Sequence, residues 1–330
     1  MTNDIVVSVW MTTYNHEQYI GQAIDSIISQ KTDYKYEIVI GDDCSSDETR
    51  TILLSYKEEY PDIIRLLFNE KNLGITANVY NVKCNCRGKY IVNLSGDDYW
   101  IDDRKIQKQV DFLELHKDYV AVCCTVAIRH DFETYNYGYY PQKRFRGKEY
   151  TLDNFAKGVL LPGHGMMMRN VFLSSSGREH FSVMTKFSHE IDDLADPILI
   201  LEEGRVFILN DIMTVYRTIS SNKRSGKSNF NSKFTYAQKF ERIVKMNNAL
   251  HIYLNEKVDL SQKYIPYISL GLIDSVSRRS FAEFKEVYNL VPAYYKQRGI
   301  FLRSVINVPV VGIKKFYNRY IKAVLYKLKY

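Results

Sequence analysis

The sequence predicts an α/β domain, in which helices flank a mostly parallel, Rossmann-like sheet, followed by a helical extension. Over the first 130 residues, short apolar runs alternate with stretches of helical periodicity. Such βαβα alternation is typical of a parallel sheet with helices on its faces. From residue 229 onward only the helical periodicity recurs. We therefore expect two domains, residues 1–225 and 226–330.

The expected strands are apolar runs that end abruptly at polar or turn-forming residues, as buried parallel strands do. The first covers residues 5–11, and the apolar side chains between residues 20 and 30 then recur at helical spacing. Ser45 and Glu48 have the spacing of a capping box, which predicts a helix from there to about residue 60. The later strands are expected at residues 36–40, 63–68, 90–94, 119–128 and 205–217, and the later helices within 72–86 and 104–116.

The composition indicates a protein of a reducing compartment. A chain of 330 residues can bury a sizeable core. Its five cysteines are odd in number and form no CxxC unit, which argues against a disulfide scaffold and a zinc site. The N-terminus lacks the basic and apolar regions of a signal peptide, and no apolar stretch has the length of a membrane span. We therefore expect a cytoplasmic protein.

The net charge of +7 is concentrated in the C-terminal tail. From residue 298 onward there are eight Lys or Arg and no Asp or Glu, which leaves 37 basic and 38 acidic residues in the rest of the chain. Nucleic-acid-binding proteins more often spread their basic residues over a folded face. No nucleic-acid partner is therefore expected.

The end of this tail has the pattern of an amphipathic helix. After Pro309, aromatic and aliphatic residues recur on one helical stripe, and the basic residues lie mainly off it. Basic amphipathic helices lie in membrane interfaces, attracted by anionic lipid. We expect this segment to hold the protein at the inner face of the cell membrane. The alternative is a helix packed on the preceding domain or a contact between two copies, and the second of these would make the protein a homo-oligomer.

Three polar clusters each follow an expected strand: residues 12–15, the pair Asp42 and Asp43, and the pair Asp97 and Asp98. Loops that follow parallel strands lie along one edge of the sheet, where ligands bind. Adjacent carboxylates repel each other unless a cation or a donor lies between them. A divalent ion shared with substrate phosphates would satisfy them; the alternative is ordinary turn chemistry. The chain has no GxGxxG motif after its first strand and no P-loop.

These clusters belong to three motifs that together resemble a known family. The motifs are VSVWMTTYN at residues 7–15, IVIGDDCSSD at 38–47 and LSGDDYW at 94–100. Their residues, order and spacing resemble the family-2 inverting glycosyltransferases of the GT-A fold. The resemblance covers roughly residues 5–220.

The resemblance assigns expected roles to the three clusters. Thr12 and Tyr14 would flank the uracil of the nucleotide-sugar donor, and Asp43, with Asp42 beside it, would accept a hydrogen bond from the base. Asp97 would contact the ribose, and Asp98 would hold Mn²⁺ or Mg²⁺ against the diphosphate. Many relatives have an acidic residue at the position of Ser95, so the first carboxylate of their Asp-x-Asp signature is missing here.

The second half of the domain would supply the acceptor side. In the family an acidic residue begins a helix that ends in Gly, and a strand ending in Tyr-Arg follows. Counting back from Gly204, Asp193 is at the catalytic-base position, with Asp192 beside it. The other interpretation is that both are ordinary acids at a helix N-terminus. His164 borders the acceptor pocket or is a solvated loop residue, and Arg217 would close over the diphosphate.

The function implied is a metal-dependent, inverting transfer of a sugar from a nucleotide-sugar, most simply a UDP-sugar. The acceptor would be a glycan, lipid-linked, in surface polysaccharide synthesis. The family's Gln-x-x-Arg-Trp motif of processive members is absent, which favours single additions. Two alternatives remain: a transferase that uses GDP- or dTDP-sugars, and an inactive GT-A module that binds nucleotide or membrane as a scaffold. Ser95 is the feature that favours the scaffold.

Overall fold

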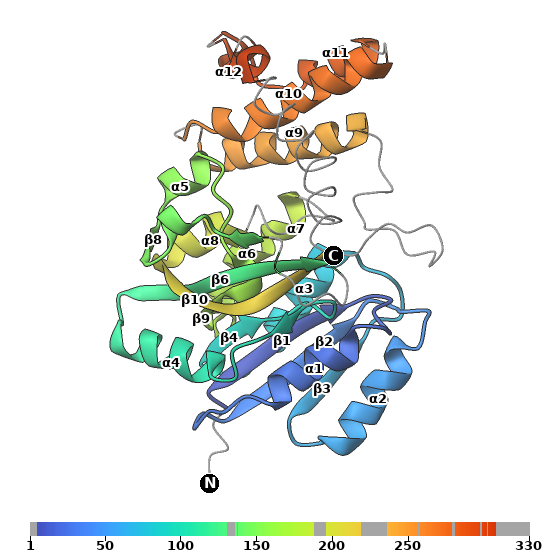
Figure 1. Cartoon of the computed structure of the whole chain (residues 1–330), viewed down its shortest axis with the longest axis vertical. Coiled ribbons are helices and arrows are strands. Elements are labelled where there is room, and N and C mark those ends of the chain that lie inside the picture. Colours follow the sequence, from blue (N-terminus) through green and yellow to red (C-terminus); the bar gives the residue numbers. More distant parts are fainter. Residues whose placement is uncertain are drawn as a thin grey trace, which may run out of the picture. The chain divides into compact units, whose positions relative to one another are not determined.

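The computed structural model (Figure 1) describes residues 5–130, 136, 138–187, 196–218, 236–255, 258–278, 281–297, 299–301 and 303–307. The chain divides into two compact units. The first unit comprises Met1–Phe155 with Val159–Ser220, and the second comprises Ala156–Gly158 with Ser221–Tyr330. The domain boundary predicted at residue 225 lies outside the described residues.

The first unit is built on a mixed, mostly parallel sheet, as predicted. The strands are β1 (Val7–Thr13), β2 (Tyr36–Asp42), β3 (Ile64–Phe68), β4 (Tyr90–Asn93), β5 (Tyr99–Trp100), β6 (Tyr119–His130), β7 (Gly138–Tyr140), β8 (Lys148–Tyr150), β9 (Met167–Arg169) and β10 (Arg205–Thr218). Their order is β3-β2-β1-β4-β9-β6-β10-β5, with β7 paired to β6 and β8 to β10. The strands β1 to β4 run parallel, as do β6 and β10, whereas β9 is antiparallel to both of its neighbours.

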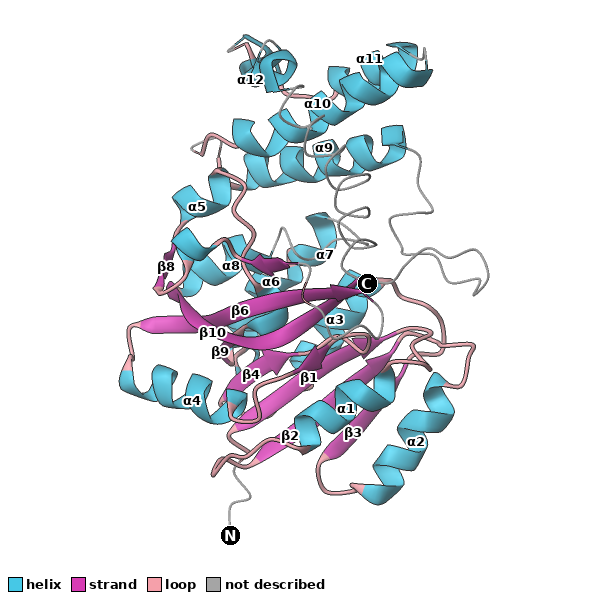
Figure 2. Ribbon diagram, in the orientation of Figure 1, coloured by secondary structure: helices cyan, strands magenta, loops and turns pink. Residues whose placement is uncertain are grey.

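Helices cover both faces of this sheet (Figure 2). The helices of the first unit, which lacks only Ala156 at the end of α5, are α1 (Ile20–Ile28), α2 (Thr49–Glu59), α3 (Ile75–Cys84), α4 (Lys105–Leu115), α5 (Leu152–Ala156), α6 (Ser175–Ser182), α7 (Met184–Phe187) and α8 (Asp196–Glu203). Side chains alternate between the faces of a strand. Val7, Val9 and Met11 of β1 therefore share a core with apolar residues of α1, α2 and α4. On the other face, Gly41 of β2 leaves room for Val82 of α3, because a Cβ at Gly41 would lie 2.3 Å from Val82 Cγ2.

The capping box predicted at Ser45 and Glu48 is not formed. The helix α2 begins at Thr49, and the Thr49 N–H donates to Asp47 Oδ1 at 3.0 Å. The Ser45 hydroxyl instead accepts the Asn15 N–H at 2.9 Å. The hydroxyl therefore joins the loop after β2 to the loop after β1. The local spacing of Ser45 and Glu48 could not indicate this contact.

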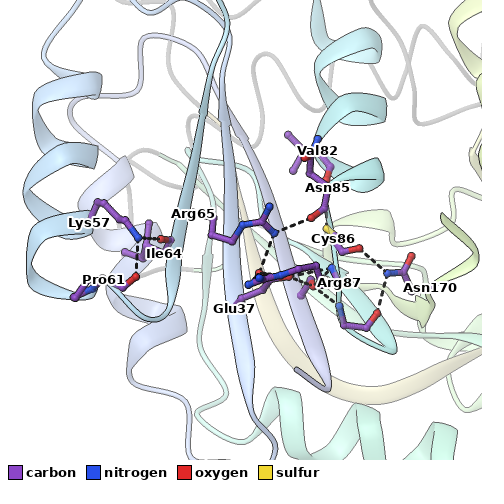
Figure 3. A network of polar contacts seen from close by, with 12 residues as sticks. Glu37, Lys57, Pro61, Ile64, Arg65, Val82, Asn85, Cys86, Arg87 and Asn170 are labelled. Atoms are coloured by element: carbon purple, nitrogen blue, oxygen red, sulfur yellow. Dashed lines mark hydrogen bonds and ion pairs between the residues drawn. The ribbon is translucent and has the colours of Figure 1, made fainter. Parts of the chain in front are cut away.

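A buried carboxylate, Glu37, connects several strands at the edge of the sheet where β2 begins (Figure 3). Its Oε1 accepts the Ser8 hydroxyl at 2.6 Å and the Arg87 N–H at 3.0 Å. Its Oε2 accepts from the guanidinium groups of Arg87 at 2.6 Å and Arg65 at 3.1 Å. Burial would raise the pKa of Glu37, but these hydrogen bonds outweigh it and hold the pKa below its usual value.

We expect Glu37→Gln to lower the free energy of unfolding by about 2–3 kcal/mol at pH 7, because it removes the negative charge that the two arginines share. The Glu37 side chain is buried, whereas both arginines are partly exposed. A lowered folded-state pKa stabilises the fold above the ordinary pKa of Glu, and this stabilisation is lost as pH falls through the folded-state value. The difference between wild type and variant should therefore be complete above about pH 5 and shrink below about pH 4. Urea unfolding across pH would measure it, with exposed Glu58→Gln as the control. A difference that does not change with pH would contradict the assigned role.

The second unit contains the predicted helical extension. Its helices are α9 (Tyr236–Tyr253), α10 (Ser261–Arg278), α11 (Phe281–Asn289) and α12 (Ala293–Gln297). Tyr295 is buried within it, and its hydroxyl accepts the Leu260 N–H at 3.0 Å and lies 3.0 Å from His251 Nδ1. No helix among the described residues combines the length and the apolar character that crossing a membrane requires. The basic segment predicted after residue 309 lies outside the described residues.

Candidate active site

The candidate active site lies at the edge of the sheet where β1, β2 and β4 end. The three strands are parallel neighbours, with Thr13 opposite Asp42 and Trp10 opposite Asn93. The loops that follow β2 and β4 are joined to the end of β1 by backbone hydrogen bonds, because the Asp43 N–H donates to the Thr13 carbonyl at 3.0 Å and the Gly96 N–H to the Thr12 carbonyl at 3.0 Å. The structure therefore brings together the three polar clusters that the sequence singled out.

The loop after β1 is held by the loop after β2. Asn15 has a φ of 56°, a conformation that asparagine tolerates better than most residues. Its side-chain Oδ1 accepts the Ser46 N–H at 2.8 Å, and the His16 N–H donates to Thr49 Oγ1 at 2.9 Å. Thr12 is half-buried beside this loop, and Tyr14 is 44% exposed. An exposed tyrosine ring on a fixed loop suits stacking against a planar base.

The carboxylates of Asp42 and Asp43 are both buried, and they bind different partners. Asp42 Oδ2 accepts from Arg50 Nε at 2.5 Å, whereas its Oδ1 accepts no hydrogen bond from the described residues. Asp43 accepts the N–H groups of Leu73 at 2.8 Å and Gly74 at 3.0 Å. Asp43 thus fixes the loop before α3 in this conformation. The base-binding roles of the two residues stay predictions.

The turn that carries Asp97 and Asp98 lies directly against the end of β1. A Cβ on Gly96 would lie 2.8 Å from Thr13 Oγ1 and 2.9 Å from His16 Nδ1, so only glycine allows this approach. Asp97 is partly exposed, and its Oδ2 lies 4.0 Å from His16 Nε2. Asp98 is 1% exposed, and its Oδ1 accepts the Arg217 N–H at 2.8 Å. The two adjacent carboxylates therefore differ sharply in environment.

Burial, and to a lesser degree the neighbouring Asp97, raises the pKa of Asp98, while His164 and the Arg217 N–H oppose the shift. Asp98 Oδ2 lies 2.9 Å from His164 Nδ1 but receives no hydrogen bond of good geometry from the described residues. A bound cation would favour the charged carboxylate. Among the described residues no group of three potential ligands is present. The residues thus fit an ion held by the Asp98 carboxylate and completed by substrate oxygens, as is common for Mg²⁺.

Arg217 is buried beneath this turn and does not extend into open space. Its Nε donates to the Asp97 carbonyl at 2.7 Å and its Nη2 to Gln22 Oε1 at 2.5 Å. The guanidinium lies 4.9 Å from the ring centres of both Tyr19 and Tyr99. In this conformation Arg217 positions the two carboxylates. Its predicted contact with a diphosphate stays a prediction.

His164 lies on a short 3-10 turn, Gly163–Gly165, with its side chain at Asp98. The Gly165 carbonyl accepts from buried Lys105 Nζ at 3.0 Å and Gln109 Nε2 at 2.7 Å, which fixes the turn. The imidazole also packs against Tyr216, with ring centres 4.8 Å apart. Sequence reasoning placed His164 near an acceptor but missed its contact with Asp98, which only the pairing of distant strands creates.

Asp192 and Asp193 lie outside the described residues. The chain is described again from Asp196, the first residue of α8, whose Oδ2 lies 2.6 Å from Lys83 Nζ. Lys83 is fully buried, with its Nζ 4.9 Å from the centre of the Trp10 ring. The start of α8 is therefore attached to α3 and β1. Sequence reasoning missed this ion pair, and no local pattern indicates it.

Comparison with known proteins identifies the family of this chain. The profile of glycosyl transferase family 2 matches residues 8–174, about half of the chain. The chain is 38% identical over 117 residues to EpsE of Bacillus subtilis, named as a glycosyltransferase, covering 35% of this chain and 41% of EpsE. It is 34% identical over 108 residues to TuaG of the same organism, named as a teichuronic acid biosynthesis glycosyltransferase, covering 33% of this chain and 42% of TuaG.

Two solved structures share the fold. Residues 1–349 of Staphylococcus aureus TarS, in complex with UDP-GlcNAc, superpose with a TM-score of 0.59 at 15% identity, covering 95% of this chain and 92% of that one. The mannosyltransferase PcManGT of Pyrobaculum calidifontis, in complex with GDP-Man and Mn²⁺, gives a TM-score of 0.50 at 15% identity, covering 93% and 88%.

The fold is that of a GT-A glycosyltransferase, as the sequence motifs predicted. This chain belongs to glycosyl transferase family 2. Its matched stretches span only about a third to two fifths of the length of several curated relatives, including EpsE and TuaG.

Proposed function

We propose that the protein transfers a sugar from a nucleotide-sugar, with UDP-sugar as the expected donor, to a glycan acceptor with inversion of configuration. The main support is the geometry at Asp98, a buried carboxylate at the carboxyl ends of parallel strands whose Oδ2 accepts no well-formed hydrogen bond from the described residues. A carboxylate oxygen of this kind suits a divalent cation shared with a diphosphate. Family membership supports the same reaction.

The expected chemistry needs few groups. The acceptor hydroxyl attacks the anomeric carbon as the bond to the diphosphate breaks, and this single displacement inverts the configuration. Asp193 would accept the hydroxyl proton as general base, with Asp192 beside it. Asp43 and Tyr14 would hold the base, with Thr12 and Asp42 beside them, and Asp97 the ribose. When bound at Asp98, Mn²⁺ or Mg²⁺ would offset charge on the departing diphosphate.

The acceptor is proposed to be a lipid-linked glycan in surface polysaccharide synthesis. Residues 1–225 would form the transferase domain, and residues 226–330 a helical extension whose basic end associates with the inner face of the cell membrane. The support is the surplus of eight basic residues and no acidic ones from residue 298 onward, which suits anionic lipid. His164, which lies beside Asp98 in the candidate active site, is the residue proposed to face the acceptor.

Calorimetric titration with UDP-, GDP- and dTDP-sugars, each with Mn²⁺ and with chelator, would test the donor. We expect one UDP-sugar to bind tightly and to lose most of its affinity in chelator. The GDP-Man complex of PcManGT, which shares the fold, makes a GDP-sugar the specific alternative. If no nucleotide-sugar binds, the proposal is overturned. That result would favour the alternative of an inactive GT-A scaffold, which the serine at position 95 supports.

A further inference from the structure

The last described helical residues of the second unit have one buried face and one exposed apolar face. Residues 300–301 and 303–307 are helical. Ile300 and Ser304 are fully buried, and the Ser304 carbonyl accepts the hydroxyl of Ser269 on α10 at 2.8 Å. This side is therefore fixed to the rest of the unit.

Beside this buried face the helix carries three large apolar side chains that are exposed. Phe301 is 44%, Val305 42% and Ile306 67% exposed. Phe301 and Val305 are four residues apart and so lie on one face of a helix, with Ile306 next to them. Phe301 also packs edge-on against Tyr288 of α11, with ring centres 5.5 Å apart, so its position is defined by contact with a second helix. Exposed apolar faces of this kind commonly mark interaction sites.

The charges in the sequence from residue 298 onward indicate a partner for this face. All eight charged side chains from residue 298 to the C-terminus are basic. A protein partner buried against an apolar helix face would not require such a one-sided charge, whereas an anionic lipid surface attracts basic residues while its hydrocarbon edge accepts apolar side chains.

We propose that Phe301, Val305 and Ile306 insert into the interfacial region of an anionic bilayer, and that the basic residues of the C-terminal tail are attracted to its headgroups. This inference rests on the membrane association proposed above and makes it specific. The tail would supply the long-range attraction, which salt screens. The three side chains would supply apolar burial, which does not depend on surface charge.

The test is co-sedimentation of the full chain with phosphatidylcholine vesicles that contain or lack phosphatidylglycerol. Wild type should bind only the anionic vesicles. The triple variant Phe301→Ser, Val305→Ser, Ile306→Ser should lose about tenfold or more of that binding, since burying several apolar groups contributes strongly to partitioning. The matched control is Leu115→Ser on α4, whose side chain is 79% exposed. Equal binding by wild type and triple variant would overturn the proposal, as would equal binding to both kinds of vesicle.

A second measurement does not depend on the stability of the triple variant. Trp10 and Trp100 are both buried, so a tryptophan placed on the surface would report its own surroundings. The emission of Ile306→Trp should shift to shorter wavelength with anionic vesicles, and that of Leu115→Trp should not. An unshifted Ile306→Trp would overturn the proposal, and so would a triple variant that changes only the monomer–dimer ratio. Nucleotide-sugar titration of the same samples reports the proposed transferase site independently.

Discussion

Asp193→Asn should bind the donor as wild type does and transfer almost no sugar. Asparagine keeps the size of the side chain but cannot accept the proton of the attacking hydroxyl. General bases contribute about 100- to 10,000-fold to rate, so kcat should fall within that range. Calorimetry with the nucleotide-sugar and single-turnover transfer on the same preparation would separate binding from chemistry.

The neighbouring Asp192→Asn is the matched control, because it removes the same charge one residue away. We expect a much smaller loss of kcat, under about tenfold, since only one carboxylate within reach of the hydroxyl is needed. If Asp193→Asn transfers sugar at the wild-type rate, it is not the base. If Asp192→Asn shows the large loss instead, the assignment moves to that residue.

Asp98→Asn should abolish the effect of divalent metal on donor binding. The substitution retains an oxygen for the Arg217 N–H, 2.8 Å from Asp98 Oδ1, so the turn should keep its shape. A metal that neutralises a diphosphate contributes several kcal/mol, and we expect donor affinity in Mn²⁺ to fall about 100-fold. In chelator, wild type and variant should bind the donor almost equally.

The control for this variant is Asp103→Asn, which removes an exposed carboxylate from a surface ion pair with Lys31 and should change little. Donor affinity in wild type that does not respond to chelator would contradict a metal at Asp98. In that case neighbouring cationic groups must offset the charge of the diphosphate. Asp98 Oδ2, which accepts no hydrogen bond of good geometry from the described residues, would then require another partner.

Much of the fold could be predicted because its signals are local. The apolar runs around β1, β2 and β4 end where polar loops begin, and the intervening helices show their spacing directly in the sequence. Parallel strands then place the following loops on one edge as a matter of geometry. This is why residues from three distant motifs could be assigned to one site before their contacts were known.

The parts that sequence reasoning missed all depend on residues far apart in the chain. Sequence reasoning did not anticipate that the Arg217 guanidinium lies against Tyr19 and Tyr99 under the turn that carries Asp97 and Asp98. The predicted contact of Arg217 with a diphosphate stays a prediction. The Ser45 hydroxyl was interpreted as a helix cap, yet it binds Asn15. In both cases the groups that contact the side chain in the structure come from distant segments, which local sequence patterns do not indicate.

The sequence by itself therefore determined the family, the α/β fold and the edge of the sheet that carries the carboxylates. Tertiary structure alone decided that Asp98 is buried 2.9 Å from His164, and that Lys83 attaches the start of α8 through Asp196. The physical reason is the distance along the chain that separates the interacting groups. Periodicity and turn chemistry describe neighbours along the chain, whereas the environment of a charge depends on which distant groups exclude water from it.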